Sequence, residues 1–399
     1  MGALRRVGPG IVTGAADVDP SLVLTATVAG AVFKLSLLWV VLLCVPFLMT
    51  VFAVSARIGH ETRQGLVDLL RETYGRRVAV VCAAVVIVIN MAMIVADLMA
   101  VTDAFSIILG QPRMYFVAAV AFSIWYVLIF HDYRRITRTL LWLSLPLYVY
   151  VLAAVLAAPS FKDVLLATLV PHIPSDPAYV VAIVALFGSL LTPYILVWQT
   201  SSRREAAIAG AHAPHEAESH TGTFVTTILS YSIIVAAASV LHASRSGELT
   251  TRLAAQALRP AVGDHGAMLF ALGIIGAGLV ALPVLVSSMC YSVAEAMGWK
   301  SGLSEHPWEA KRFYVLISAA MFLAAAANFF RMNPVKAMYW SQILAGTLTV
   351  PILLFILILS NDRRIMRTVN TRWQNFWVGA ACGGLVAAGI MLAAMKGLR

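Results

Sequence analysis

Long runs of apolar residues, separated by short charged loops, constrain the fold of this chain more than any other feature. About 20 consecutive apolar residues are enough to cross the hydrocarbon core of a bilayer as a helix, and such runs recur along the whole chain. Of the 399 residues, 60% are hydrophobic and 12% are charged, whereas a soluble domain carries about 25% charged residues. The sequence therefore predicts an all-α membrane protein, because a helix satisfies its own backbone hydrogen bonds in lipid.

We expect about eleven transmembrane helices, counted from the apolar runs, within a single transmembrane domain that covers residues 1–399. The predicted spans lie near residues 8–33, 36–56, 78–107, 114–130, 137–158, 178–201, 222–242, 266–297, 312–328, 335–359 and 374–395. Between them, residues 57–77 carry apolar positions at helical spacing, which predicts a short helix at the membrane interface. Residues 243–264 show a similar pattern on the opposite side.

The distribution of Lys and Arg predicts the orientation of these spans. Most of the basic residues fall in loops on the side that holds the N-terminus. Because cytoplasmic loops carry the excess of Lys and Arg, the N-terminus is predicted to be cytoplasmic and, with an odd number of spans, the C-terminus lies outside. The formal net charge of +10 is thus explained by topology, and no nucleic-acid partner is expected.

The cysteines lie in apolar runs without CxxC spacing, which favours free thiols: Cys44, Cys82, Cys290 and Cys382.

Two of the predicted spans contain a proline near their middle. Pro20 follows Asp19 in the first span, and Pro193 follows Thr192 in the sixth. Proline lacks a backbone N–H and disfavours helix in the residue before it, so each span is predicted to break there. Matching breaks in corresponding spans indicate an inverted-repeat (5+5) transporter fold, with a substrate site between broken helices 1 and 6. The predicted repeats cover residues 8–158 and 178–359, with an extra helix near 374–395.

Ionisable residues inside the spans are the first candidates for a functional site, because a charge is costly to place in a membrane. All of them are acidic: Asp17, Asp19, Asp97, Asp103 and Glu295. Carboxylates without a buried Lys or Arg favour a cation over an anionic or zwitterionic substrate. Asp19 is the leading candidate, since a carboxylate beside a broken helix offers hard oxygen ligands to a metal ion or Na⁺.

Plainer structural roles stay open for three of the polar residues. Asp19 could lie in a simple proline kink, hydrogen-bonded to a neighbouring helix. Asp97 could be capped by hydroxyl groups from adjacent spans. Gln342, in the tenth span, could form a helix–helix hydrogen bond without further function.

Several of these segments together resemble the Nramp superfamily of divalent metal transporters, in a bacterial branch with DPS in place of the DPGN motif. The resemblance runs nearly end to end. It is carried by GPGIVTGAADVDPS, SARIG, VADL, FGSLLTPYILVWQTS, GIIGAGLVALPVLVSSMCYSVAEAMGW, NPVKAMYWSQILAG and NDRR. It implies a multi-pass protein of the bacterial cytoplasmic membrane, which agrees with the predicted spans and the cytoplasmic N-terminus.

The resemblance also implies roles for single residues. The metal-binding aspartate of the family falls at Asp19, the glutamine that reaches the site at Gln342, and the aspartate of proton transfer at Asp97. The companion glutamate of that aspartate falls at Ala100. Four further positions depart from the family: the asparagine that closes DPGN falls at Leu22, the methionine and histidine of MPH at Thr192 and Tyr194, and a later histidine at Gln199.

These departures predict a metal site made of oxygen atoms only. A methionine sulfur favours soft transition ions, and Thr192 removes that preference, so we expect Mg²⁺ or Mn²⁺ as the substrate. The expected ligands are Asp19, Ser21, Thr25, Gly188 (through its carbonyl), Thr192 and Gln342. A proton or charge relay is assigned to Asp97, Asp17 and Glu295, although the lost histidines and glutamate put proton coupling in doubt.

The function expected from the sequence is therefore import of a divalent metal cation by alternating access. The alternatives are an organic cation or amino acid permease of the same fold, and a membrane sensor that binds metal without moving it. An enzyme is not expected, because no nucleophile–base pair, His and carboxylate ligand triad or nucleotide loop is present. No cofactor is expected, since the metal ion is the substrate, and no obligate protein partner is evident beside the lipid bilayer.

Overall fold

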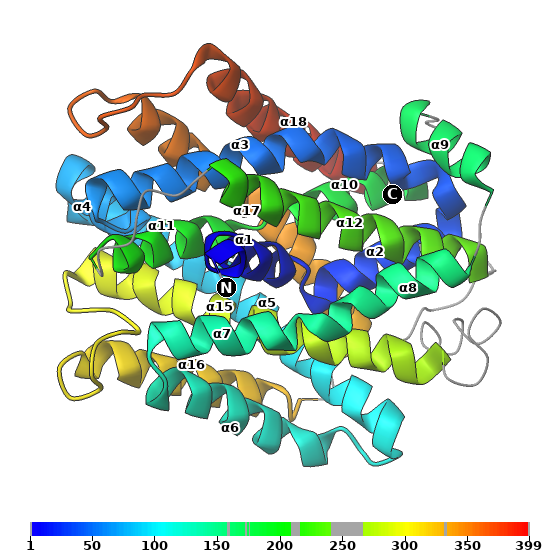
Figure 1. The fold of residues 1–399 in the computed structure, drawn as a ribbon, viewed down its shortest axis with the longest axis horizontal. Coiled ribbons are helices and arrows are strands. Elements are labelled where there is room, and N and C mark those ends of the chain that lie inside the picture. Colours follow the sequence, from blue (N-terminus) through cyan, green and yellow to red (C-terminus); the bar gives the residue numbers. More distant parts are fainter. Residues whose placement is uncertain are drawn as a thin grey trace.

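Helices account for nearly all of the regular structure in a computed structural model of the chain (Figure 1). It describes residues 2–157, 160–171, 174, 176–208, 216–240, 266–330 and 333–397, and these contain no strand. The α-helices are α1 (Gly2–Asp17), α2 (Pro20–Phe33), α3 (Leu38–Thr62), α4 (Leu66–Tyr74), α5 (Arg76–Leu109), α6 (Met114–Phe130), α7 (Tyr133–Leu143), α8 (Val149–Leu156), α9 (Phe161–Leu169), α10 (Pro177–Leu190), α11 (Pro193–Ile208), α12 (Glu216–Val240), α15 (Gly266–Met297), α16 (Lys311–Ala327), α17 (Pro334–Asn361) and α18 (Arg372–Gly397). Two 3₁₀ turns, η1 (Lys34–Leu37) and η2 (Leu145–Tyr148), join neighbouring helices.

The first and sixth predicted spans are each two helices rather than one. Helix α1 ends at Asp17 and α2 begins at Pro20, while α10 ends at Leu190 and α11 begins at Pro193. In both cases a proline occupies the first position of the second helix, where its missing N–H would have no helical partner anyway. The chain changes direction at the first break, because α1 is seen nearly end-on in Figure 1 while α2 runs across the picture.

Eight stretches of described helix are long and apolar enough to cross a membrane. One of them, Pro20–Thr62, contains both α2 and α3, and α6 is a shorter apolar helix. The all-α membrane architecture is therefore confirmed. The number of eleven crossings and the inverted repeat stay predictions, although each predicted span corresponds to helix in the described residues.

The four half-helices at the breaks lie inside a frame of longer helices. Helices α1 and α2 both pack against α12, α10 packs against α17, and α11 packs against α3 and α15. The pair α5 and α15 forms the most extensive helix contact, and α6 with α16 lies at one edge of the molecule while α18 lies at the other (Figure 1). The breaks are thus surrounded by protein.

Close helix approach requires glycine at two of these contacts. A Cβ on Gly14 of α1 would lie 2.2 Å from the carbonyl oxygen of Gly222 in α12. At the crossing of α10 and α17, a Cβ on Gly188 would lie 3.2 Å from the Cα of Gly346 and 3.3 Å from the carbonyl oxygen of Gln342. Gly188 therefore lets α17 bring Gln342 close to the second break.

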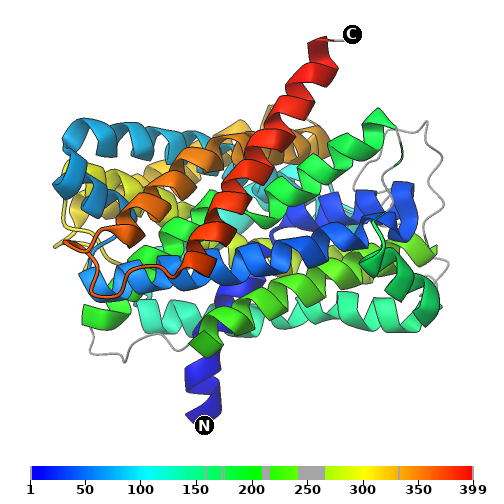
Figure 2. The ribbon, with the colours of Figure 1, turned by 90° about the horizontal axis from the view of Figure 1, so that it is seen from above.

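The two ends of the bundle carry different connections. Helix α4 and the loops at 298–310 and 362–371 lie at one end, whereas η1 and α9 lie at the other (Figures 1 and 2). Figure 2 also shows that the first and last described helices, α1 and α18, project from opposite faces of the bundle. The helix predicted within residues 57–77 is present as the last turns of α3 followed by α4, while the similar pattern at 243–264 lies outside the described residues.

Candidate ion-binding site

Asp19 lies in the gap between α1 and α2 and caps the second of these helices. Its backbone is extended (φ −75°, ψ 167°), and its Oδ1 accepts a 2.6 Å hydrogen bond from the backbone N–H of Leu22. A short polar side chain before a proline at the first helical position is a strong helix start. The side chain is fully buried, and the amide Nε2 of Gln342 in α17 donates to its Oδ2 at 3.4 Å.

A second buried carboxylate, that of Asp97 in α5, contacts Ser21 of α2. The hydroxyl of Ser21, the second residue of α2, donates to Asp97 Oδ1 at 2.7 Å. Both side chains have no exposed surface. The sequence left a hydroxyl-capped carboxylate open as an alternative for Asp97, and this contact has that form.

The second break is bonded to the end of α1. The Thr192 hydroxyl donates to Asp17 Oδ1 at 3.0 Å, and the Tyr194 hydroxyl donates to the carbonyl oxygen of Ala16 at 2.5 Å. Thr192 precedes α11 and Asp17 is the last residue of α1, so the two bonds join the two broken helices directly. Sequence reasoning expected the two breaks at one site but missed both contacts, because no local pattern pairs residues that are 175 and 178 positions apart.

Three oxygen atoms among these residues have no hydrogen-bond partner. They are Asp17 Oδ2, Asp97 Oδ2 and Gln342 Oε1, and all of them are buried. Buried polar atoms are normally satisfied, so each of these unsatisfied acceptors is a candidate to contact a cation. The hydrogen-bond partners described for Asp17, Asp19 and Asp97 are hydroxyl groups, an amide and a backbone N–H, without a Lys or Arg.

The carboxylates do not form one joint set of ligands. Within the described part of the chain, no three His, Cys, Asp or Glu side chains lie together closely enough to hold a metal ion. Asp17 contacts Thr192, Asp19 contacts Gln342, and Asp97 contacts Ser21. An ion held here would therefore be bound by at most two of the described carboxylates, completed with neutral oxygen atoms.

Two residues of the predicted site have other contacts. The Thr25 hydroxyl donates to the carbonyl oxygen of Ser21 within its own helix, at 2.8 Å. Glu295 lies at the carboxyl end of α15, where it accepts hydrogen bonds from Ser201, Arg204 and the first backbone N–H groups of α4. These contacts hold the ends of neighbouring helices together, and none of them involves Asp17, Asp19 or Asp97. Asp103, in the last part of α5, is only partly buried.

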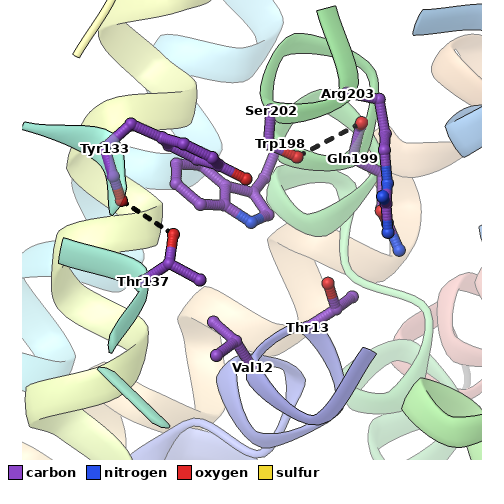
Figure 3. A pocket seen from close by; sticks show the side chains of 8 residues that line it. All are labelled: Val12, Thr13, Tyr133, Thr137, Trp198, Gln199, Ser202 and Arg203. Atoms are coloured by element: carbon purple, nitrogen blue, oxygen red, sulfur yellow. Dashed lines mark hydrogen bonds between the residues drawn. The ribbon is translucent and has the colours of Figure 1, made fainter. Parts of the chain in front are cut away.

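A separate pocket lies beside α11, about two turns beyond Thr192 (Figure 3). Val12 and Thr13 of α1 and Tyr133 and Thr137 of α7 face four residues of α11 across it: Trp198, Gln199, Ser202 and Arg203. Gln199, the position where the resemblance implies a histidine, is 4% exposed. The lining contains a guanidinium and no carboxylate, so the pocket itself does not suit a metal cation.

Comparisons with known proteins concern the chain as a whole. A family model described as "Natural resistance-associated macrophage protein-like" (Nramp) matches residues 10–395. The rice protein "Metal transporter NRAT1" (Oryza sativa subsp. japonica) is 25% identical over 69% of this chain, and the match covers 54% of its own length, or about half. "Divalent metal cation transporter MntH" of Klebsiella pneumoniae is 24% identical over 93% of this chain and 89% of its own.

Solved structures show the same fold. The manganese transporter of Eremococcus coleocola, as its H236A mutant, superposes with a TM-score of 0.75 at 15% identity, over 97% of this chain and 85% of its own. MhsT in complex with L-phenylalanine is more distant, with a TM-score of 0.57 at 12% identity, over 96% of this chain and 98% of its own. Because the family model spans nearly the whole sequence, the chain belongs to the Nramp family.

Proposed function

We propose that this protein is a secondary transporter that moves a divalent metal cation across a membrane by alternating access, with Mg²⁺ or Mn²⁺ favoured. The observation that carries the proposal is the buried carboxylate of Asp19 in the gap between α1 and α2, bonded to Gln342 and close to unsatisfied oxygen atoms. The relatives named above are metal transporters rather than enzymes, and the chain is likewise not an enzyme.

The chemistry of the neighbouring groups supports a hard cation. Mg²⁺ and Mn²⁺ prefer carboxylate, carbonyl and water oxygens, whereas thioether sulfur selects softer ions. The side chains that contact one another at the two breaks are Asp17, Asp19, Ser21, Asp97, Thr192 and Gln342, and none of them carries sulfur. In this proposal Asp19 is the charged ligand, completed by Thr192, Gln342, backbone carbonyl groups and water.

Alternating access is supported by the position of the site. A broken helix can change direction at its break, and both breaks lie where half-helices contact the surrounding frame. Relative movement of α1 and α11 against α5 and α15 would open the site to one side and then to the other. The proposed location is the cytoplasmic membrane of a bacterium, with the N-terminus in the cytoplasm.

Uptake by proteoliposomes tests the proposal. Purified protein is reconstituted, Mn²⁺ entry is followed with an internal metal-sensitive dye, and the Asp19→Ala variant is expected to reduce entry to the level of empty liposomes. Thr27→Val is the matched control, because Thr27 is a buried residue of α2 whose hydroxyl bonds only to the carbonyl oxygen of Val23 in its own helix. Full uptake by Asp19→Ala would refute the role of Asp19.

An organic cation or amino acid is the second candidate substrate, because the fold is shared with MhsT in complex with L-phenylalanine. A competition assay distinguishes a divalent metal cation from an organic cation or amino acid as the substrate. Mg²⁺, Ca²⁺, Mn²⁺ and Cd²⁺ are each added outside, with a pH dye inside the liposomes to detect proton movement. Divalent ions should compete with one another and amino acids should not, while strong preference for Cd²⁺ would contradict an oxygen-only site. Metal binding without any uptake would instead indicate a sensor.

A further inference from the structure

We infer that Asp17 is a positioning residue for the ion site, which acts through Thr192 and strengthens the preference for hard cations. The inference rests on the proposed function, since it concerns the same site. Its basis is the hydrogen bond from the Thr192 hydroxyl to Asp17 Oδ1, 3.0 Å long, between two side chains that are 1% and 0% exposed.

Thr192 needs an external partner to fix its hydroxyl group. It lies between the end of α10 at Leu190 and the beginning of α11 at Pro193, so it has no helical position that would direct its side chain. A hydroxyl group has one proton and two lone pairs, and the proton rotates to the nearest acceptor. Because Asp17 accepts the hydrogen bond from this hydroxyl group, the lone pairs of the Thr192 oxygen remain available to a cation.

The carboxylate also makes this oxygen a better ligand. An outer group that hydrogen-bonds a ligand fixes its orientation and raises its basicity, as carboxylates do for metal-bound histidine. In a buried setting such chains of hydrogen bonds strengthen one another. A threonine oxygen with Asp17 behind it therefore approaches the donor strength that Mg²⁺ and Mn²⁺ favour.

Asp17 acts from behind Thr192 rather than as a ligand beside Asp19. Its Oδ1 accepts from the Thr192 hydroxyl while its Oδ2 has no partner, and among the described residues Asp17, Asp19 and Asp97 do not lie together as a three-residue metal-binding group. The adjacent bond from Tyr194 to the carbonyl oxygen of Ala16 holds the beginning of α11 against the end of α1. This second bond helps to keep Asp17 and Thr192 next to each other.

A double-mutant cycle tests the inference by calorimetric titration of Mn²⁺ and Cd²⁺ into the purified transporter. Asp17→Leu removes the acceptor, and we expect it to weaken Mn²⁺ binding by about 10- to 100-fold, the usual effect of losing an outer-shell partner. Thr192→Val should weaken it similarly, and Asp17→Leu should add nothing in the Thr192→Val background. Both changes should lower the preference for Mn²⁺ over Cd²⁺ by the same factor.

Asp17→Asn separates orientation from charge, because it keeps an oxygen acceptor for Thr192 but is neutral. It should lose less Mn²⁺ affinity and less of the ion preference than Asp17→Leu, because the orientation of Thr192 is kept while the added basicity from the charge is lost. A loss as large as that of Asp17→Leu, or additive effects in the double variant, would overturn the positioning role. Asp17→Ala repeats the test if the leucine variant does not fold, and Thr27→Val serves as the control for loss of a buried hydroxyl in the same region.

The outcomes also distinguish this inference from the proposed function. If the unmodified protein binds neither Mn²⁺ nor Cd²⁺, the proposed function fails. If it binds Mn²⁺ and Asp19→Ala abolishes binding, but Asp17→Leu and Asp17→Ala both bind like the unmodified protein, only the role of Asp17 fails.

Discussion

Gln342 directs one polar atom of its side chain to Asp19 and leaves the other without a partner. The Nε2–Oδ2 distance of 3.4 Å is long for a hydrogen bond, and Oε1 is buried and unsatisfied. A helix–helix hydrogen bond alone would not leave the amide oxygen unpaired. The amide is therefore placed to contribute its oxygen to an ion while its nitrogen orients Asp19.

Gln342→Leu is expected to raise the Mn²⁺ concentration for half-maximal uptake by about 30-fold, because one neutral ligand and one weak hydrogen bond are lost, each of about 1 kcal/mol. The measurement is the initial rate of uptake in proteoliposomes against Mn²⁺ concentration. Ser341→Ala is the control, since the hydroxyl of the preceding residue bonds only within α17. An unchanged concentration dependence would show that Gln342 does not contribute to the site.

At the level of single residues, the sequence predicts the features that neighbouring residues determine. Pro20 directly follows Asp19, so the helix start and the burial of a carboxylate beside it follow from adjacent residues. The bond between Thr192 and Asp17 joins residues that are 175 positions apart, and no local pattern contains it. Thr25 shows the converse, because helical spacing places it near Ser21, yet its hydroxyl is satisfied within the helix.

Among the helices, α4, α11 and α15 are joined at one end of the bundle by Glu295. Its Oε2 accepts from the backbone N–H groups of Val67 and Asp68, and its Oε1 accepts from Ser201 and lies 3.4 Å from a guanidinium nitrogen of Arg204. The carboxylate is therefore placed at the positive end of α4. Since α11 begins at the second break, this contact fixes the far end of a helix that transport is proposed to move.

Glu295→Ala is expected to destabilise the protein by about 3–5 kcal/mol, the usual result of removing one partner from a buried ion pair. The measurement is thermal unfolding in detergent, followed by tryptophan fluorescence. Glu309→Ala is the matched control, because Glu309 pairs with Lys300 on the surface, where that lysine's hydrogen bond lowers the pKa of Glu309. Equal melting temperatures for the two variants would refute the anchoring role.

Several helix boundaries differ from those predicted from the sequence. The span predicted at 137–158 is divided by η2 into α7 and α8, because Pro146 removes one backbone donor. The span predicted at 36–56 continues as α3 to Thr62, since hydropathy marks the apolar part of a helix and not its polar last turns. Short α9 was not predicted, because its nine residues are too few for a membrane crossing.

For the whole molecule, the positions of the loops at the two ends of the bundle relate the distribution of basic residues to the orientation in the membrane. Helix α4 and the loops at 298–310 and 362–371 lie at one end of the bundle (Figure 1), and these segments contain Arg71, Lys300, Arg363, Arg364 and Arg367. The opposite end, with η1 and α9, holds Lys34 and Lys162. The positive-inside rule therefore predicts that the first end faces the cytoplasm.

Labelling of single introduced cysteines tests this orientation. Thr73 of α4 and Lys162 of α9 are exposed and lie at opposite ends of the bundle. The native cysteines are all buried and free, so they should react little with a membrane-impermeant maleimide. In intact cells Lys162→Cys should be labelled and Thr73→Cys should not, whereas after permeabilisation both should react. Labelling of Thr73→Cys alone in intact cells would contradict the predicted orientation.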